Sequence, residues 1–276
     1  MFAIIRKKWE STPFYPKIFK LVLPIIIQNL LSAAVSSADI VMLNYLEEGA
    51  QTAISAVSLA TQYSNVLFSV YFGLGTGVTM LCAQYYGKGD YSAIRVIQGI
   101  ALRISLLVTV LLAGLSFFFP ETLMRIFTND SELIIVGAGY LRAVSVAYLC
   151  WGITEVYLAA LRSIGKVSIS TSLNVLAFGM NIVLNAVFIF GLFGAPQLGA
   201  TGVALATSLS RLVELAGCFV VSAFQKEVKL QLHMIFVRNK VLFKDFVQMS
   251  LPALANDVIW GLAFSTYSVI IGHLGS

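Results

Sequence analysis

IFKLVLPIIIQNLLSAAVSSADIVMLNYL, residues 18–46, is an almost unbroken apolar stretch that holds one carboxylate, Asp39, and no basic residue after Lys20. About 20 such residues cross the hydrocarbon core of a bilayer as a helix. A charge near the middle of a bilayer costs at least about 2.5 kcal/mol, so charged residues there usually face a protein interior or an aqueous cavity and mark an ion or substrate path. The stretch predicts a membrane-spanning helix, and Asp39 makes transport the first function to consider.

The composition indicates an integral membrane protein with many spans. Of the 276 residues, 58% are hydrophobic and only 11% are charged, whereas soluble domains carry roughly 25% charged residues. The mean hydropathy is +0.87. The apolar stretches are long, which favours helices over the alternating ten-residue strands of a barrel. The net charge of +5 does not indicate a nucleic-acid partner, because the basic residues lie between the apolar stretches. The expected partner is the lipid bilayer.

The apolar stretches predict seven spans, at residues 18–46, 52–86, 93–119, 132–162, 167–191, 200–223 and 246–274. Basic residues concentrate in cytoplasmic loops. One side of this predicted bundle receives nearly all of them: Arg6, Lys7, Lys8, Lys17, Lys20, Lys88, Arg95, Arg162, Lys166, Lys226, Lys229, Arg238, Lys240 and Lys244. We therefore expect a multi-pass protein of a prokaryotic cytoplasmic membrane with its N-terminus in the cytoplasm. This orientation disfavours a rhodopsin-like receptor, whose N-terminus is extracellular.

The start of the seventh span repeats the start of the first. LPIIIQN at 23–29 aligns with LPALAND at 251–257, and six spans separate the two copies. An even number gives both copies the same direction, which makes a parallel repeat, a known transporter arrangement. We expect a six-helix N-terminal lobe at 1–223, a basic cytoplasmic linker at 224–245 and the first helix of a truncated C-terminal lobe at 246–276. The alternative is that an apolar helix with an early proline recurs by chance.

Several runs, in their order and spacing, resemble the multidrug and toxic compound extrusion (MATE) family over nearly the whole chain. They are FGLGTG at 72–77, AQYYG at 83–87, LRSIGK at 161–166, NIVLN at 181–185 and LGATGVALAT at 198–207, together with the proline and aspartate of the first span. The resemblance implies an all-α bundle of twelve helices in two six-helix lobes. It also implies export of organic cations against coupled entry of Na⁺ or H⁺.

Four polar residues in three predicted spans are expected to lie at similar depth. At about 1.5 Å per residue from the nearest helix ends, Asp39, Asn181, Asn185 and Thr207 fall at one level of the membrane. Asn181 and Asn185 are four residues apart and share one helix face. Hard cations prefer oxygen ligands, and a carboxylate in a low-dielectric site also binds a proton. We predict a cation-coupling site, with Na⁺ on Asp39, Asn181 and Asn185 and a proton on Asp39 as the two alternatives.

The family resemblance points to the same positions, with one departure. Some members carry a carboxylate where this chain has Asn185, which leaves one negative charge in place of two and puts a purely proton-driven relay in doubt. No cofactor other than the coupling ion is expected. A polar network that only holds the helices together is the alternative, because hydrogen bonds between membrane helices are worth about 0.6 kcal/mol on average.

A second set of residues is predicted to face the substrate: Asp257, Trp260, Gln62, Asn65 and Glu155. Asp257 lies near the start of the seventh span, and Trp260 offers a π-face to a cation one turn later. The alternative for Asp257 is an interfacial charge that reaches water. Polar packing is the alternative for Gln62 and Asn65, and a packing residue facing the cytoplasmic cavity is the alternative for Glu155.

The chain shows no enzyme signature and no ATP-binding loop, and its two histidines have no spacing typical of zinc binding or nucleophilic catalysis. We expect a secondary exporter of small organic cations that works by alternating access, monomeric as a complete chain. One alternative is a lipid-linked oligosaccharide flippase, which would line its cavity with arginines such as Arg103, Arg142 or Arg211. Another is a non-transporting membrane receptor or scaffold. Arg211 and Glu214, spaced i,i+3, most simply pair with each other.

Overall fold

The computed structural model describes residues 14–46 and 49–274, and the predicted basic N-terminus lies largely outside them. The described residues are mostly helical and contain no strand. The helices are α2 (Phe14–Asn44), α3 (Ala50–Gly87), α4 (Tyr91–Phe118), α5 (Pro120–Phe127), α6 (Ser131–Ser163), α7 (Val167–Phe190), α8 (Gly199–Phe224) and α9 (Lys240–Leu274), with short 3₁₀ turns η1 (Leu192–Gly194) and η2 (Leu232–Phe236). The predicted all-α class is confirmed.

Short polar motifs begin and end these helices. The carboxylate of Asp90 accepts a hydrogen bond from Ala93 N at 2.9 Å at the start of α4, and Asp130 accepts one from Glu132 N at 2.8 Å at the start of α6. Both satisfy backbone donors that the first helical turn leaves free. Gly191 ends α7 with φ 68°, a left-handed conformation that glycine adopts without strain.

Among the described residues, six helices are long and apolar enough to cross a membrane: Val22–Asn44 within α2, and the whole of α3, α4, α6, α7 and α8. They coincide with the first six predicted spans, so the chain is a multi-pass membrane protein. The seventh predicted span corresponds to α9, which does not pass the same test over its described residues. Its first half carries Lys240, Lys244, Asp245 and Asp257, and whether it crosses stays a prediction.

The structure adds two features that hydropathy did not reveal. α5 is a short helix with Pro120 at its first position, where proline costs little, and it lies in the predicted loop between the third and fourth spans. α9 begins at Lys240, earlier than the predicted start at 246, because Asn239 accepts a hydrogen bond from Leu242 N at 3.0 Å and caps the helix within the polar linker. Hydropathy detects only the apolar part of such a helix.

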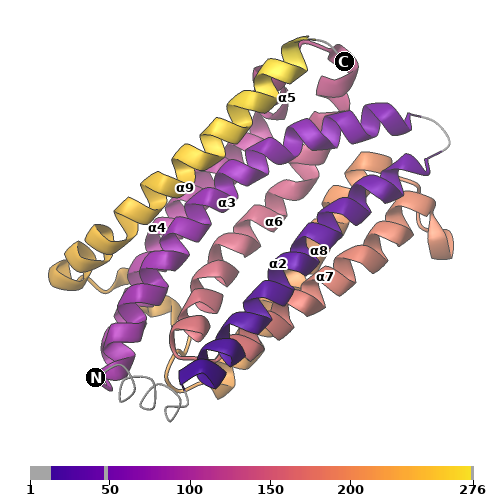
Figure 1. Cartoon of the computed structure of the whole chain (residues 1–276). Coiled ribbons are helices and arrows are strands. Elements are labelled where there is room, and N and C mark those ends of the chain that lie inside the picture. The colour runs from indigo at the N-terminus through magenta and orange to yellow at the C-terminus, as the bar shows by residue number, and fades with distance from the viewer. Residues whose placement is uncertain (1–13, 47–48, 275–276) are drawn as a thin grey trace, which may run out of the picture.

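Figure 1 shows α2, α7 and α8 on one side of the bundle and α3, α4 and α9 on the other, with α6 between them. α3 packs along both α6 and α9, and α6 also packs against α4 and α8. Glycines allow the close approach of α3 and α9, since a Cβ on Gly73 would lie 2.5 Å from Leu254 Cα. In the same view α2 and α9 run in the same direction (Figure 1), as a parallel repeat requires.

The core forms two apolar clusters, one above the other along the bundle. One gathers residues from the first half of α6, such as Leu141 and Tyr148, with the first half of α3. The other gathers the second half of α6, such as Tyr157 and Leu161, with α4 and the start of α9. α6 therefore acts as the central element that fixes the positions of its neighbours around a polar cavity.

Candidate functional site

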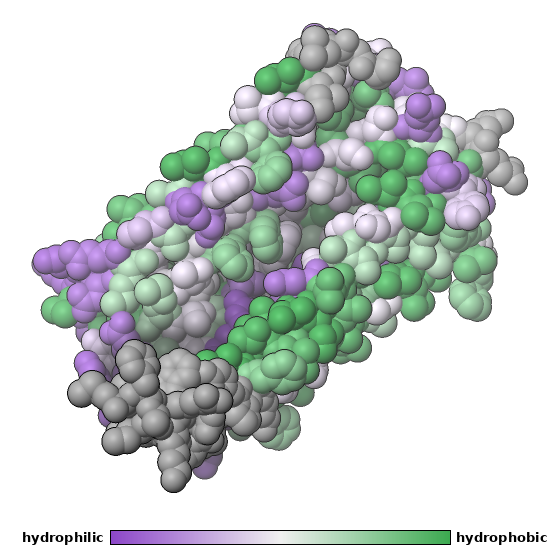
Figure 2. Space-filling view, in the orientation of Figure 1, coloured by the Kyte–Doolittle hydropathy of each residue, from purple (hydrophilic) through white to green (hydrophobic). Residues whose placement is uncertain are grey.

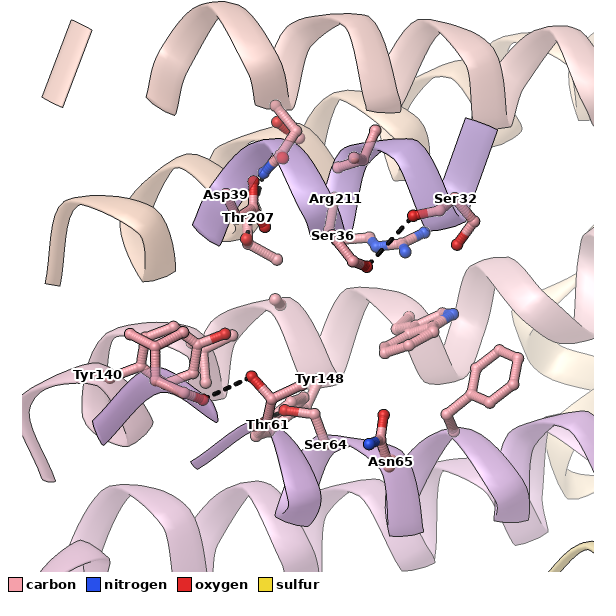
Figure 3. Close-up of a pocket in the computed structure, with 18 of the residues that line it drawn as sticks. Ser32, Ser36, Asp39, Thr61, Ser64, Asn65, Tyr140, Tyr148, Thr207 and Arg211 are labelled. Carbon is pink, nitrogen blue, oxygen red and sulfur yellow. Dashed lines mark hydrogen bonds between the residues drawn. The ribbon is translucent and has the colours of Figure 1, made fainter. Parts of the chain in front are cut away.

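A cavity of about 450 Å³ lies between α2, α3, α6, α7 and α8. Figure 2 shows the molecular surface hollowed between the two groups of helices, with polar residues in the hollow and apolar residues beside it. Serine, threonine, tyrosine and amide side chains line much of the cavity, and two charged residues line it as well, Asp39 and Arg211. The close-up in Figure 3 shows Asp39 beside Thr207, with Arg211 and Ser32 farther along the cavity. We call these two regions the Asp39 end and the Arg211 end.

At the Asp39 end, the four predicted coupling residues form one chain of hydrogen bonds. Asn185 Nδ2 donates to Asp39 Oδ1 at 2.5 Å and to Asn181 Oδ1 at 3.1 Å. Asn181 Nδ2 donates to Thr207 Oγ1 at 3.2 Å, and Thr207 Oγ1 donates to Val203 O at 3.0 Å. The structure thus brings the four residues together across α2, α7 and α8, as the depth argument predicted. Whether they couple transport to an ion stays a prediction.

One oxygen in this network of hydrogen bonds has no partner within the described structure. Asn185 is fully buried, and its Oδ1 makes no hydrogen bond within the described structure. A buried amide oxygen without a donor costs free energy, and a bound cation is one ligand that removes this cost. Asp39, Asn181 and Asn185 supply carboxylate and amide oxygens, the donor set that suits a hard cation. The residues present therefore fit the predicted Na⁺ site, and the Asp39 carboxylate equally accepts a proton.

At the Arg211 end, a guanidinium is held between a carboxylate and an aromatic ring. Arg211 Nη1 donates to Glu214 Oε2 at 2.7 Å, and the Glu214 side chain is fully buried. The Arg211 guanidinium carbon lies 4.5 Å from the centre of the Trp151 ring, a distance at which cation–π attraction operates. The predicted Arg211–Glu214 pair is present, and Arg211 also faces the cavity.

The predicted substrate residues divide into two groups. Gln62 and Asn65 line the cavity from α3. Glu155 instead pairs with Arg162 at 2.5 Å, and both side chains are mostly buried. Asp257 accepts a hydrogen bond from Asn256 Nδ2 at 3.3 Å, and Trp260 is 60% exposed. Glu155, Asp257 and Trp260 do not line the described cavity. Their predicted contact with a substrate stays a prediction.

Sequence reasoning missed the hydroxyl groups on α3 and α6. Tyr148 Oη and Ser64 Oγ share a hydrogen bond at 2.6 Å, and Tyr140 and Thr61 also line the cavity (Figure 3). Tyr140 and Tyr148 are eight residues apart, so both face the same side of a helix. This spacing was visible in the sequence, but aromatic residues at helical spacing also occur in ordinary cores.

Arg103 and Arg142, the other two arginines considered for a flippase, bind protein groups outside the cavity. Arg103 donates to Ile235 O at 2.6 Å and to Val237 O at 2.8 Å, which fastens the linker between α8 and α9 to α4. Arg142 lies 3.8 Å from Glu121, and both side chains are more than half exposed. Neither arginine lines the cavity, so the arginine-lined cavity expected of a flippase is reduced to Arg211 alone.

A family comparison decides the identity of the fold. Residues 24–187 match the model of the MatE family. The chain belongs to the MatE family. The match covers more than half of the sequence and includes Asp39, Asn181 and Asn185. The resemblance inferred from the sequence runs is therefore confirmed.

Curated relatives agree with this assignment. The chain is 29% identical to a probable multidrug resistance protein NorM of Thermotoga maritima, over 80% of this chain and 47% of that protein. It is 25% identical to the multidrug export protein MepA of Staphylococcus aureus, over 97% of this chain and 58% of that protein. An uncharacterized transporter YisQ of Bacillus subtilis is 22% identical, over 94% and 56%. The chain thus spans about half the length of the relatives it matches.

Solved structures show the same fold. An outward-facing multidrug resistance MATE family transporter superposes with a TM-score of 0.78 at 22% identity, over 90% of this chain and 54% of that one. A transporter of the same superfamily from Pyrococcus furiosus superposes with a TM-score of 0.77. The six-helix lobe is therefore the MatE-family fold, while the twelve-helix assembly and the residue boundaries of the lobes stay predictions.

Proposed function

We propose that this chain forms one lobe of a secondary multidrug exporter that exchanges organic cations for Na⁺ or H⁺ by alternating access. Family membership supports this proposal, as do the multidrug relatives named above. The observation that carries it is the Asp39–Asn185–Asn181–Thr207 network of hydrogen bonds. It places one carboxylate at a polar cavity and bonds it to Asn185, whose buried amide oxygen has no partner within the described structure. Binding of a small cation or a proton would stabilise such a site.

In this proposal the coupling ion and the substrate compete for one negative charge. Asp39 holds a drug cation while the cavity faces the cytoplasm. After the cavity opens outward, Na⁺ or H⁺ neutralises Asp39 and the drug leaves. Asn181 and Asn185 keep the carboxylate in place and supply further oxygens for Na⁺. The expected setting is the cytoplasmic membrane of a prokaryotic cell, with the N-terminus in the cytoplasm.

The test is efflux of a cationic dye from vesicles that contain the protein as its host makes it. Wild type and Asp39→Asn are compared under a Na⁺ gradient and, separately, under a pH gradient. We expect one gradient to drive efflux and the substitution to abolish it, since the amide cannot bind a proton or balance a cation. Glu121→Gln is the matched control, because it removes an exposed carboxylate outside the cavity. Wild-type vesicles that release no dye under either gradient would refute antiport, and unimpaired Asp39→Asn efflux would refute the role of Asp39.

A further inference from the structure

The linker between α8 and α9 is fastened to the helices along most of its length. Lys166, in the turn between α6 and α7, donates to Gln225 and, at 3.1 Å, to Glu227 Oε2. Leu230 N donates to Ser222 Oγ, near the end of α8, at 2.7 Å. The linker is therefore a positioned part of the structure, and the fold decides where its exposed side chains point.

Farther along the linker, an arginine of α4 fixes the direction of Phe236. Arg103 donates from Nε to Ile235 O at 2.6 Å and from Nη2 to Val237 O at 2.8 Å. The residues on both sides of Phe236 are thus bound to α4, and Ile235 packs against the apolar core. The Phe236 side chain is 82% exposed. The backbone hydrogen bonds hold its ring away from the core.

Phe236 belongs to a surface that combines apolar and basic side chains. Val241, at the start of α9, is 69% exposed. Arg238 and Lys240 stand between the two apolar residues in the sequence and are also exposed. Residues 228–244 contain no acidic residue, and neither basic side chain forms an ion pair with a described residue. Figure 2 shows hydrophilic residues gathered at the end of the bundle where α9 begins.

The depth of η2 matches the edge of the hydrocarbon core. α4 has 28 residues, so it is about 42 Å long and exceeds a core of about 30 Å by about 12 Å. Gly99 lies eight residues after Tyr91, the first residue of α4, which is about 12 Å along the helix axis. A Cβ on Gly99 would collide with Met234 O, so η2 lies against α4 at this level. If α4 crosses the core upright, this level falls at the core edge or just inside it.

The basic residues lie nearer to the ends of the helices. Ser250 of α9 packs against Gly77 of α3, and the two helices run in opposite directions. Lys240 is ten residues before Ser250, as far as Gly87, the last residue of α3, is beyond Gly77. Lys240 therefore lies level with the end of α3, where lipid headgroups are expected, while η2 lies deeper. An aromatic ring near the acyl chains with basic groups at the headgroups is the pattern of interfacial membrane binding.

We propose that Phe236, Arg238 and Lys240 form a binding site for anionic phospholipids at the membrane surface. Phe236 lies among the upper acyl chains, and the two basic side chains bind the headgroup phosphates. The site sets how α9 enters the membrane, because Asn239, between the two basic residues, caps that helix. This inference does not rest on the proposed function, since it uses only the linker of a multi-pass membrane protein.

The experiment measures which lipids surround position 236. A bimane label is attached to Phe236→Cys in the protein as its host makes it, in a background without other reactive cysteines. Cys82, Cys150 and Cys218 are buried. The protein is placed in vesicles of equal parts phosphatidylglycerol and phosphatidylcholine, with bromine on the acyl chains of one lipid or of the other. Bromine quenches only a label that touches it, so the two quenching values give the local lipid ratio. Lys226→Cys, at an exposed position of the same linker, is the matched control site and should be quenched little.

We expect strong quenching at position 236 and a local ratio of phosphatidylglycerol to phosphatidylcholine about fivefold or more above the bulk ratio. About fivefold is the effect of one basic side chain near an anionic surface. Adding Arg238→Gln/Lys240→Gln should return the ratio to the bulk value and leave the total quenching nearly unchanged. Arg125→Gln, on an exposed arginine of α5, should leave the ratio as it is.

Two results would overturn the proposal. If neither brominated lipid quenches the label, Phe236 faces water or another part of the protein, and the wavelength of bimane emission tells these two apart. If both lipids quench equally, or if the preference for phosphatidylglycerol survives Arg238→Gln/Lys240→Gln, the two basic residues do not recognise anionic lipid.

Discussion

The two ends of the cavity use charge in opposite ways. At the Asp39 end, the carboxylate has only neutral partners, an amide donor at 2.5 Å and further amide and hydroxyl groups beyond it. At the Arg211 end, the charge has a partner of opposite sign, since Arg211 pairs with Glu214. Outside the cavity lining, Glu155 pairs with Arg162 in the same way. The Glu155–Arg162 pair lies within electrostatic range of Glu214.

The difference indicates which end exchanges its ligands. A charge with only neutral partners is stabilised by whatever cation arrives, and it loses that stabilisation when the cation leaves. A paired charge is already stabilised by its partner, so an arriving ligand stabilises it less. Removing one member of such a pair destabilises the fold instead. We therefore expect the Asp39 end to control coupling, and the Arg211 end to control stability.

The largest effect is expected from breaking the Arg211–Glu214 pair on one side only. Arg211→Gln leaves Glu214 buried without its cation, which should lower the free energy of unfolding by about 3–5 kcal/mol, while the double variant Arg211→Gln/Glu214→Gln recovers most of that loss. Asp39→Asn should change it by less than about 1 kcal/mol, because no charged partner is left behind. Unfolding of the purified proteins in SDS, followed by loss of helicity, measures all three.

The comparison between the two ends fails if Asp39→Asn destabilises the protein as much as Arg211→Gln does. Asp39 would then be part of the structural support of the bundle, as the alternative of a purely polar network holds. Arg142→Gln, on α6, serves as a control for the general effect of losing an arginine from a helix, since the exposed Arg142–Glu121 pair should contribute less than about 1 kcal/mol.

A second, smaller effect is expected at Asn185, on ion binding and not on stability. Asn185→Leu keeps the approximate volume but removes the donor to Asp39 and the unpartnered Oδ1. If Na⁺ is the coupling ion, its affinity should fall by about tenfold to a hundredfold, the range for hydrogen bonds and ligands at a charged group. The concentration of Na⁺ that half-saturates dye efflux gives this value. An unchanged half-saturating Na⁺ concentration would place the ion elsewhere or assign the coupling to protons.

Asn181→Leu sharpens the same measurement. Asn181 donates to Thr207 and accepts from Asn185, so it acts on Asp39 through Asn185. Its effect on Na⁺ should be in the same direction and smaller than that of Asn185→Leu. The reverse order would show that Asn181, and not Asn185, supplies the stronger ligand.

The sequence predicted the Asp39 end better than the Arg211 end for a physical reason. Asp39, Asn181, Asn185 and Thr207 are polar residues in apolar helices, and distance from the helix ends gives their depth. Depth and face together were enough to predict that they meet. The six spans were found in the same way, since hydropathy and length largely decide which helices cross a bilayer.

The features that the sequence did not predict depended mostly on which helices pack side by side, and hydropathy carries little of that information. Glu155 is an exception: it was expected near the substrate, but it pairs with Arg162, seven residues further along the same helix, and that spacing was visible in the sequence. The cation–π contact of Arg211 depends on Trp151 from α6 lying against it, which no spacing in the sequence indicates. α5 and the early start of α9 were missed because they are short or polar.

The smallest effect is expected from the hydroxyl pairs between the two ends. Tyr148 Oη and Ser64 Oγ share a hydrogen bond at 2.6 Å and link α6 to α3. Tyr148→Phe removes this bond while keeping the ring in its packing, so stability should fall by about 0.6 kcal/mol, the average for hydrogen bonds between membrane helices. The unfolding assay used for Arg211→Gln measures it. Dye efflux should keep its ion dependence, because Tyr148 lies outside the Asp39 chain. A change in the driving ion for Tyr148→Phe would show that the coupling site extends across the cavity to α6, and the two ends would then act as one site.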